Sequence, residues 1–100
     1  MLESGLILVT ITQNMDTIKK YGVKRIGLFG SFARDTNNEE SDIDILVDFN
    51  DGYVNIDNYM GLKFFLEDLF KRKVDLVRSC ILKPRIRENV MRSVIYAEKQ

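Results

Sequence analysis

The sequence contains no histidine and no tryptophan, and it contains only one cysteine and one proline. Because histidine is absent, the chain cannot form a Ser-His-Asp or Cys-His catalytic group, or a zinc site with imidazole ligands. Any acid–base or metal chemistry must therefore depend on carboxylates. The lone cysteine, Cys80, has no partner for a disulfide within the chain, which favours a reducing compartment such as the cytoplasm.

The sequence also lacks a long hydrophobic run and an excess of charge of either sign. No stretch is long enough to cross a bilayer, and the apolar start has no basic segment of the kind that begins a signal peptide. We therefore expect a cytoplasmic protein without a membrane partner. Fifteen basic and fifteen acidic residues cancel, which argues against direct nucleic-acid binding by bulk charge. The same balance leaves little repulsion between molecules, so it is compatible with a homo-oligomer or a protein partner.

Residues 1–100 have the size and composition of one globular domain, since 45% of them are hydrophobic and 30% are charged. Residues 1–11 form an N-terminal extension for which three alternatives stay open. The segment could lengthen the first helix, form an edge strand or cover a partner, because periodicity does not separate helix from strand over so few positions.

Hydrophobic patterning predicts an α+β fold. Strands are expected over residues 23–29, 43–49 and 74–77. Helices are expected from Thr12 or Asn14 to about residue 21, over residues 31–35, from Asn55 or Asp57 to about residue 70, and from Pro84 through Val94. This order gives a small mixed three-stranded sheet with helices packed mainly on one face.

Two aspartates, Asp42 and Asp44, begin the second strand. Side chains two residues apart on a strand project from the same face, so the two carboxylates repel each other. Asp44 also lies among Ile43, Ile45 and Leu46, where an unpaired charge is costly. Asp often occurs in turns, but this spacing favours a pair that is kept for a divalent cation.

A third carboxylate, Asp75, lies between Val74 and Leu76 in the third expected strand. The alternative to a site role is a strand-edge aspartate that pairs with Lys73 or Arg78. We favour the site role, because this strand should lie beside the strand that carries the first two aspartates.

The Gly30-Ser31 pair closes the first strand and opens a short helix. Backbone N–H groups at such a turn suit an anion such as phosphate, although the pair could also be a simple strand-to-helix turn. Arg34 on the same turn could bind triphosphate oxygens, or it could merely cover apolar surface with its stem. A phosphate site and a cation site joined by one short loop suggest an enzyme that handles a metal-bound nucleoside triphosphate.

Gly30-Ser31, followed after ten residues by Asp42-Ile43-Asp44, resembles the Gly-Ser…Asp-x-Asp motif of the DNA polymerase beta-like nucleotidyltransferases. The closest likeness is to the minimal nucleotidyltransferases, which consist of little beyond the catalytic domain. It runs from about Asn14 to Ala97 and includes the segments 73–77 and 82–87.

The resemblance implies a polymerase beta-like core and a metal-dependent nucleotidyltransferase. Asp42, Asp44 and Asp75 would hold two Mg²⁺ ions, with Mn²⁺ as an alternative. Gly30, Ser31 and Arg34 would bind the triphosphate of the substrate, ATP or another nucleoside triphosphate. Asp75 would also help to activate the acceptor hydroxyl. The family often carries glycine where this chain has Asp35, and a negative charge there weakens an electropositive loop.

Minimal nucleotidyltransferases of this kind resemble the antitoxin half of two-gene modules whose partner is a HEPN-domain ribonuclease toxin. The resemblance implies that the enzyme transfers AMP to a tyrosine of that toxin and silences it. One alternative is a non-catalytic antitoxin that inhibits by binding, and another is a nucleotidyltransferase that acts on a small molecule or an RNA end. The basic group Lys83, Arg85, Arg87 and Arg92 is either a solvated helix face or a docking surface for an acidic partner.

Overall fold

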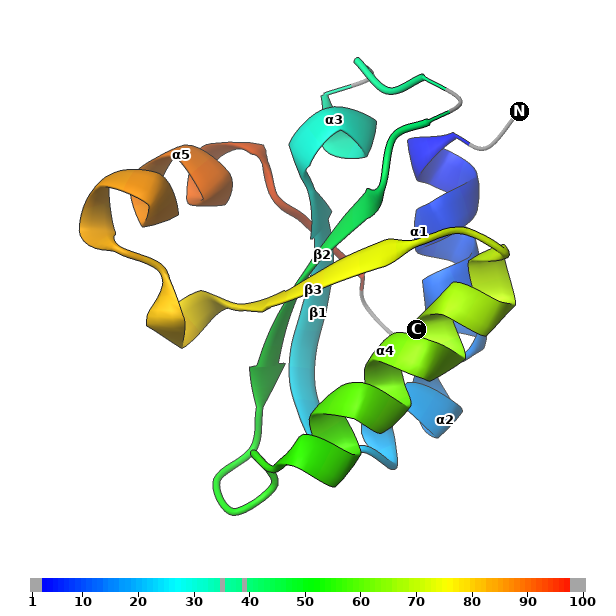
Figure 1. The fold of residues 1–100 in the computed structure, drawn as a ribbon, viewed down its shortest axis with the longest axis vertical. Coiled ribbons are helices and arrows are strands. Elements are labelled where there is room, and N and C mark those ends of the chain that lie inside the picture. The colour runs from blue at the N-terminus through cyan, green and yellow to red at the C-terminus, as the bar shows by residue number, and fades with distance from the viewer. Residues whose placement is uncertain (1–2, 35, 39, 98–100) are drawn as a thin grey trace.

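The computed structural model describes residues 3–34, 36–38 and 40–97. Within them the chain forms a four-stranded mixed sheet in the order β3-β2-β1-β4 (Figure 1). The strands are β1 (Val23–Phe29), β2 (Ile43–Phe49), β3 (Val74–Arg78) and β4 (Ile95–Ala97). The helices are α1 (Ser4–Gln13), α2 (Met15–Lys19), α3 (Gly30–Ala33), α4 (Ile56–Phe70) and α5 (Pro84–Ser93), with a 3₁₀ turn η1 (Ser79–Ile81).

The fourth strand corrects the three-stranded sheet that the sequence predicts. β4 is antiparallel to β1 and pairs Ile95 with Leu28 and Ala97 with Ile26. The last helix accordingly ends at Ser93, and Val94, expected inside it, is its C-cap. A strand of three residues is too short to show an alternating pattern, and the preceding helical spacing runs straight into it.

The N-terminal extension is helical from Ser4 onward, so the edge strand is not formed, whereas a role in covering a partner stays open because Leu6 and Val9 are exposed. Ile7 and Ile11, one helical turn apart, are completely buried in the core. Their burial outweighs the low intrinsic helix propensity of the β-branched residues in this segment. α2 follows directly, with Met15 and Ile18 buried as the sequence predicts.

The remaining predicted elements agree closely with the structure. β1 and β2 have the expected bounds, and β3 extends one residue further, to Arg78. Asn55, rather than Asp57, caps α4, because its side-chain oxygen accepts a hydrogen bond of 2.8 Å from the Asn58 N–H. α4 ends at Phe70, and the left-handed conformation of its C-cap, Lys71, turns the chain toward β3.

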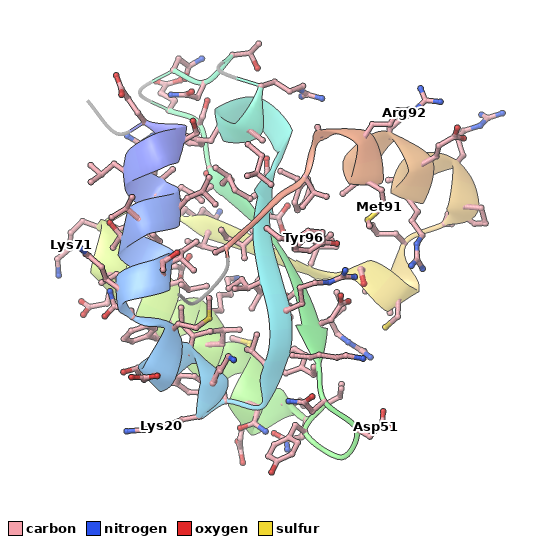
Figure 2. All side chains as sticks on the ribbon, turned by 180° about the vertical axis from the view of Figure 1, so that it is seen from behind. Lys20, Asp51, Lys71, Met91, Arg92 and Tyr96 are labelled. Atoms are coloured by element: carbon pink, nitrogen blue, oxygen red, sulfur yellow. The ribbon has the colours of Figure 1, made fainter. Side chains whose placement is uncertain are left out.

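The helices divide between the two sides of the sheet. α1, α2 and α4 lie together on one side, and α5 lies on the other (Figure 1). The prediction of helices mainly on one face is therefore right for these three, but α5 departs from it. No residue of α5, all of which is described, is buried, and Ile86 is 49% exposed. Met91 and Tyr96 approach each other between α5 and β4 (Figure 2).

The core lies between the sheet and the helices α1, α2 and α4. Ile43, Ile45 and Val47 alternate along β2 and are at most 1% exposed. Leu46 on the opposite face of β2 is also fully buried, so the middle of this strand is covered on both faces, as its run of apolar residues predicts. Among the described residues, no helix is long and apolar enough to cross a membrane.

Replacing Leu66 tests this packing. Leu66 on α4 is fully buried, so Leu66→Ala should lower the free energy of unfolding by about 2–5 kcal/mol. Phe64→Ala on the same helix is the matched control, since Phe64 is 57% exposed and its loss should change stability by only about 0.5 kcal/mol. Urea denaturation of the two variants measures both values, and equal losses would contradict the described packing.

Candidate active site

The pairing of β2 with β3 brings the predicted carboxylates together. The two strands are parallel, and Asp44 is the register partner of Asp75. Paired residues on neighbouring strands project to the same face, and Asp42 lies one residue before β2. Both Asp42 and Asp75 act electrostatically on Asp44.

This carboxylate face is the one opposite the main core. Along β2, buried Ile43 and Ile45 point to the core, while Asp44 between them is partly exposed. Along β3, exposed Asp75 alternates in the same way with buried Val74 and Leu76. The strands therefore use their apolar side chains for packing and present their carboxylates on the other surface.

The carboxylates of the site differ from Asp48, a fourth aspartate on the same face. Asp48 forms an ion pair of 3.0 Å with Arg25 and accepts a hydrogen bond from the Ser79 hydroxyl. Within the described part of the chain, no such ion pair reaches Asp42, Asp44 or Asp75. The alternative in which Asp75 is a structural residue paired with a neighbouring cation is therefore not observed.

Gly30 places the turn that opens α3 directly against Asp44. Its φ of +73° is one that residues with a side chain rarely adopt. A Cβ at this position would lie 2.8 Å from Cγ and 3.0 Å from Cβ of Asp44. Only glycine allows this approach, so the two motif halves that the sequence predicts to act together are in contact.

The surroundings of Asp44 disfavour its charge. Burial raises the pKa of this carboxyl above the usual value, and the negative charges of Asp75 and Asp42 raise it further. A backbone hydrogen bond from Ser31 and the positive charge of Arg34 lower the pKa but do not cancel the rise. The Ser31 backbone and the charge of Arg34, the C-cap of α3, thus act on Asp44, while their role in binding a triphosphate stays a prediction.

The residues present fit a hard divalent cation in the type and charge of their donors. All three contribute carboxylate oxygens, which Mg²⁺ prefers, and a cation would relieve the repulsion that raises the pKa of Asp44. As the side chains stand, no group of three acidic or cysteine residues in the described segments is gathered into a metal-holding cluster. The carboxylates share a face, and their rotamers must turn inward to share a cation.

One residue near the site is not predicted from the sequence. Arg72, in the connection between α4 and β3, donates a hydrogen bond of 2.9 Å to the carbonyl oxygen of Ser41, the residue before Asp42. The loop over residues 36–41 has no apolar anchor, so some polar contact must hold it, but the sequence does not indicate which residue provides it. Asp35, also singled out in the sequence, lies outside the described residues.

A family model described as a nucleotidyltransferase domain matches residues 11–97. The chain belongs to this nucleotidyltransferase family. It is therefore an enzyme, and the family predicted from the Gly-Ser and Asp-x-Asp motifs is confirmed. The matched span includes all four strands and leaves most of α1 outside it.

The chain is similar to characterised relatives over most of its length. It is 41% identical over 78 residues to the protein adenylyltransferase MntA of Thermococcus cleftensis, which covers 78% of each chain. A solved structure assigned to the minimal nucleotidyltransferases matches with a TM-score of 0.81 and 33% identity, over 94% of this chain and 95% of the other.

A more distant solved structure shares the fold. It is a complex of a tri-AMPylated HEPN toxin from Shewanella oneidensis with its MNT antitoxin. The TM-score is 0.66 and the identity is 19%, over 94% of this chain and 73% of the matched chain.

Substitution of Gly30 tests the contact between the two motif halves. Gly30→Ala should lower the free energy of unfolding by about 1–2 kcal/mol, because alanine is strained in the left-handed conformation. The overlap of its Cβ with Asp44 should lower it further. Gly52→Ala is the matched control, because Gly52 has a φ of +84° and no neighbouring atoms within 4 Å of a Cβ. Chemical denaturation should show a larger loss for Gly30→Ala, and equal losses would argue against the close approach.

The raised pKa of Asp44 predicts a pH-dependent stability difference. A carboxyl whose pKa is higher in the folded state loses its proton more readily in the unfolded state, so stability falls as pH rises above the usual carboxyl pKa and levels off above the raised one. Asp44→Asn does not titrate there, so its stability relative to the unsubstituted protein should increase between about pH 3 and pH 7. Denaturation at several pH values measures this difference, and a constant or shrinking difference would contradict the pKa direction.

Proposed function

We propose that the protein is a metal-dependent adenylyltransferase that transfers AMP from ATP to a tyrosine hydroxyl of a cognate HEPN-domain toxin, and that it thereby acts as an antitoxin. The observation that carries the proposal is the register of Asp44 with Asp75 beside the Gly30 turn. The similarity to an MntA adenylyltransferase supports AMP as the transferred group. The fold shared with an antitoxin in a HEPN toxin complex supports the choice of acceptor.

In this proposal Asp42, Asp44 and Asp75 hold two Mg²⁺ ions, which Mn²⁺ can replace. The cations, when bound, supply positive charge that neutralises the triphosphate and lowers the pKa of the acceptor hydroxyl. Asp44 is the innermost of the three carboxylates, being partly buried, whereas Asp42 and Asp75 are exposed. The site is thus open to a large acceptor on the side of Asp42 and Asp75.

The remaining site residues orient the nucleotide. With no side chain at Gly30, phosphate oxygens can approach the backbone of the turn that Gly30 and Ser31 form beside Asp44. Arg34 is exposed and its charge acts on Asp44, which supports a role for its guanidinium in binding the phosphates.

The transfer step balances without any further reactant. The acceptor oxygen forms a bond to the α-phosphorus of ATP while the bond from that phosphorus to pyrophosphate breaks. Asp75, at the exposed end of the carboxylate group, takes the hydroxyl proton. Positioning and charge neutralisation supply most of the acceleration.

Labelled ATP tests the proposal. Incubation of the protein with ATP labelled in the α-phosphate, Mg²⁺ and the toxin encoded beside it should label the toxin on tyrosine. The double variant Asp42→Asn with Asp44→Asn should reduce labelling at least about 10³-fold, since it removes the ligands of the metal. Asp51→Asn with Asp68→Asn is the charge-matched control, because both residues are exposed, Asp51 in the turn after β2 and Asp68 on α4, which packs on the other side of the sheet from the carboxylates, and it should retain activity.

Two outcomes would contradict the proposal, one for the site and one for the reaction. Undiminished labelling by the Asp42 and Asp44 double variant would reject the assignment of the site. Full neutralisation of the toxin by that variant, without labelling, would instead favour a non-catalytic antitoxin that inhibits by binding. Mass spectrometry of the toxin and an assay of its ribonuclease activity distinguish these results.

A further inference from the structure

The loop over residues 36–41 connects the Gly-Ser turn to the Asp-x-Asp strand. Its described residues form a closed turn, in which the Asn38 N–H donates to the Ser41 hydroxyl oxygen at 2.9 Å and the Ser41 N–H donates to the Asn38 carbonyl oxygen at 3.1 Å. These bonds shape the turn but do not fix it relative to the sheet. Since Asp42 follows directly, whatever anchors this turn also sets the position of a site carboxylate.

Arg72, in the connection between α4 and β3, supplies that anchor. Its Nη1 donates hydrogen bonds to the carbonyl oxygens of Ser41 at 2.9 Å and of Asn38 at 3.4 Å. The next residue, Lys73, accepts a hydrogen bond of 3.0 Å from the Ile43 N–H at its carbonyl oxygen. Both chain neighbours of Asp42 are therefore tied to the short connection between α4 and β3.

The same guanidinium also touches α3. Its Cζ lies 5.4 Å from the ring centroid of Phe32, a distance at which a cation is attracted to an aromatic face. Phe32 is completely buried and follows Ser31 in α3. One side chain thus contacts the element that carries the Gly-Ser turn and the loop that leads to the aspartates, while its own backbone leads into the strand of Asp75.

We infer that Arg72 is a positioning residue of the site, which holds Asp42 in register with the Gly-Ser turn without contacting the substrate. The inference rests on the proposed function for its catalytic consequence. A guanidinium suits the role because it is planar, so it can stack on a ring and donate in its plane at the same time. A lysine ammonium can donate to the carbonyl oxygens but cannot stack in this way.

Three variants test the role of Arg72. Arg72→Met removes both contacts, Arg72→Lys retains a donor, and Lys71→Met is the matched control. Lys71 is adjacent and carries the same charge, but its ion pair with Asp68 is highly exposed, so its loss should be neutral. Amide hydrogen exchange of residues 41–43, Mn²⁺ affinity and the kcat and KM of adenylyl transfer are measured for each variant.

The expected pattern is specific to positioning. Arg72→Met should exchange faster at residues 41–43 but not at Ile45 and Val47 in the buried middle of β2, and its Mn²⁺ affinity and kcat should fall about 10–100-fold, as for other residues that orient metal ligands. KM for ATP should change much less than kcat. The exchange rate, Mn²⁺ affinity and kcat of Arg72→Lys should lie between those of Arg72→Met and those of the unsubstituted protein. Lys71→Met should have the same values as the unsubstituted protein.

Other patterns would overturn the inference. Unchanged exchange at residues 41–43 in Arg72→Met would show that Arg72 does not anchor the loop. Faster exchange with unchanged Mn²⁺ affinity would show that the anchor does not position the carboxylates. Exchange and Mn²⁺ affinity are measured without ATP or toxin, so they decide the role of Arg72 even if the unsubstituted protein transfers no adenylyl group and the proposed function fails.

Discussion

The repulsion among three carboxylates on one sheet face is the constraint on which the rest of the site depends. Asp44 is held beside Asp75 by the parallel register of β2 and β3, and beside Asp42 by the two-residue period of the strand. The fold supports this unfavourable arrangement through the opposite face of the same strands, where Ile43, Ile45 and their neighbours are buried. The hydrophobic core and the acidic site are thus two sides of one sheet.

The contacts around the carboxylates come from separate parts of the chain. The turn at Gly30 approaches Asp44 because it has no Cβ, and Arg72 holds the intervening loop from a connection that begins about thirty residues after the Asp-x-Asp motif. The neighbouring Asp48 differs from the site carboxylates, since it forms an ion pair with Arg25 that links β2 to β1. Among the described residues, no ion pair like that of Asp48 reaches the three site carboxylates, and this difference is the physical reason for assigning them to a cation.

Much of the site could be predicted from the sequence, because its signals are local. The apolar flanks of Asp42 and Asp44 indicate a strand, and their spacing indicates that they share its exposed face. The preceding Gly-Ser pair indicates a turn. The position of Asp75 followed from the same reasoning, since a buried strand after a helix pairs with the strand before that helix. The structure places all three on one face, while their roles in catalysis stay a prediction.

The features that the sequence did not reveal depend on long-range contacts. β4 exists because residues 95–97 pair with β1, almost seventy residues earlier, and its three residues carry no pattern of their own. α1 is helical because Ile7 and Ile11 are buried in a core that other elements build. Arg72 looked like one of several cations at a helix end, and only the folded chain shows that its guanidinium lies between Phe32 and Ser41.

A crystal structure with Mn²⁺ and a non-hydrolysable ATP analogue tests the central claim most directly, because the anomalous signal of manganese locates the cations independently of the protein coordinates. The account predicts manganese about 2.0–2.3 Å from carboxylate oxygens of Asp42, Asp44 and Asp75, with the triphosphate against the turn at Gly30 and Ser31. Manganese bound away from these carboxylates, or a nucleotide on the far side of the sheet, would contradict it.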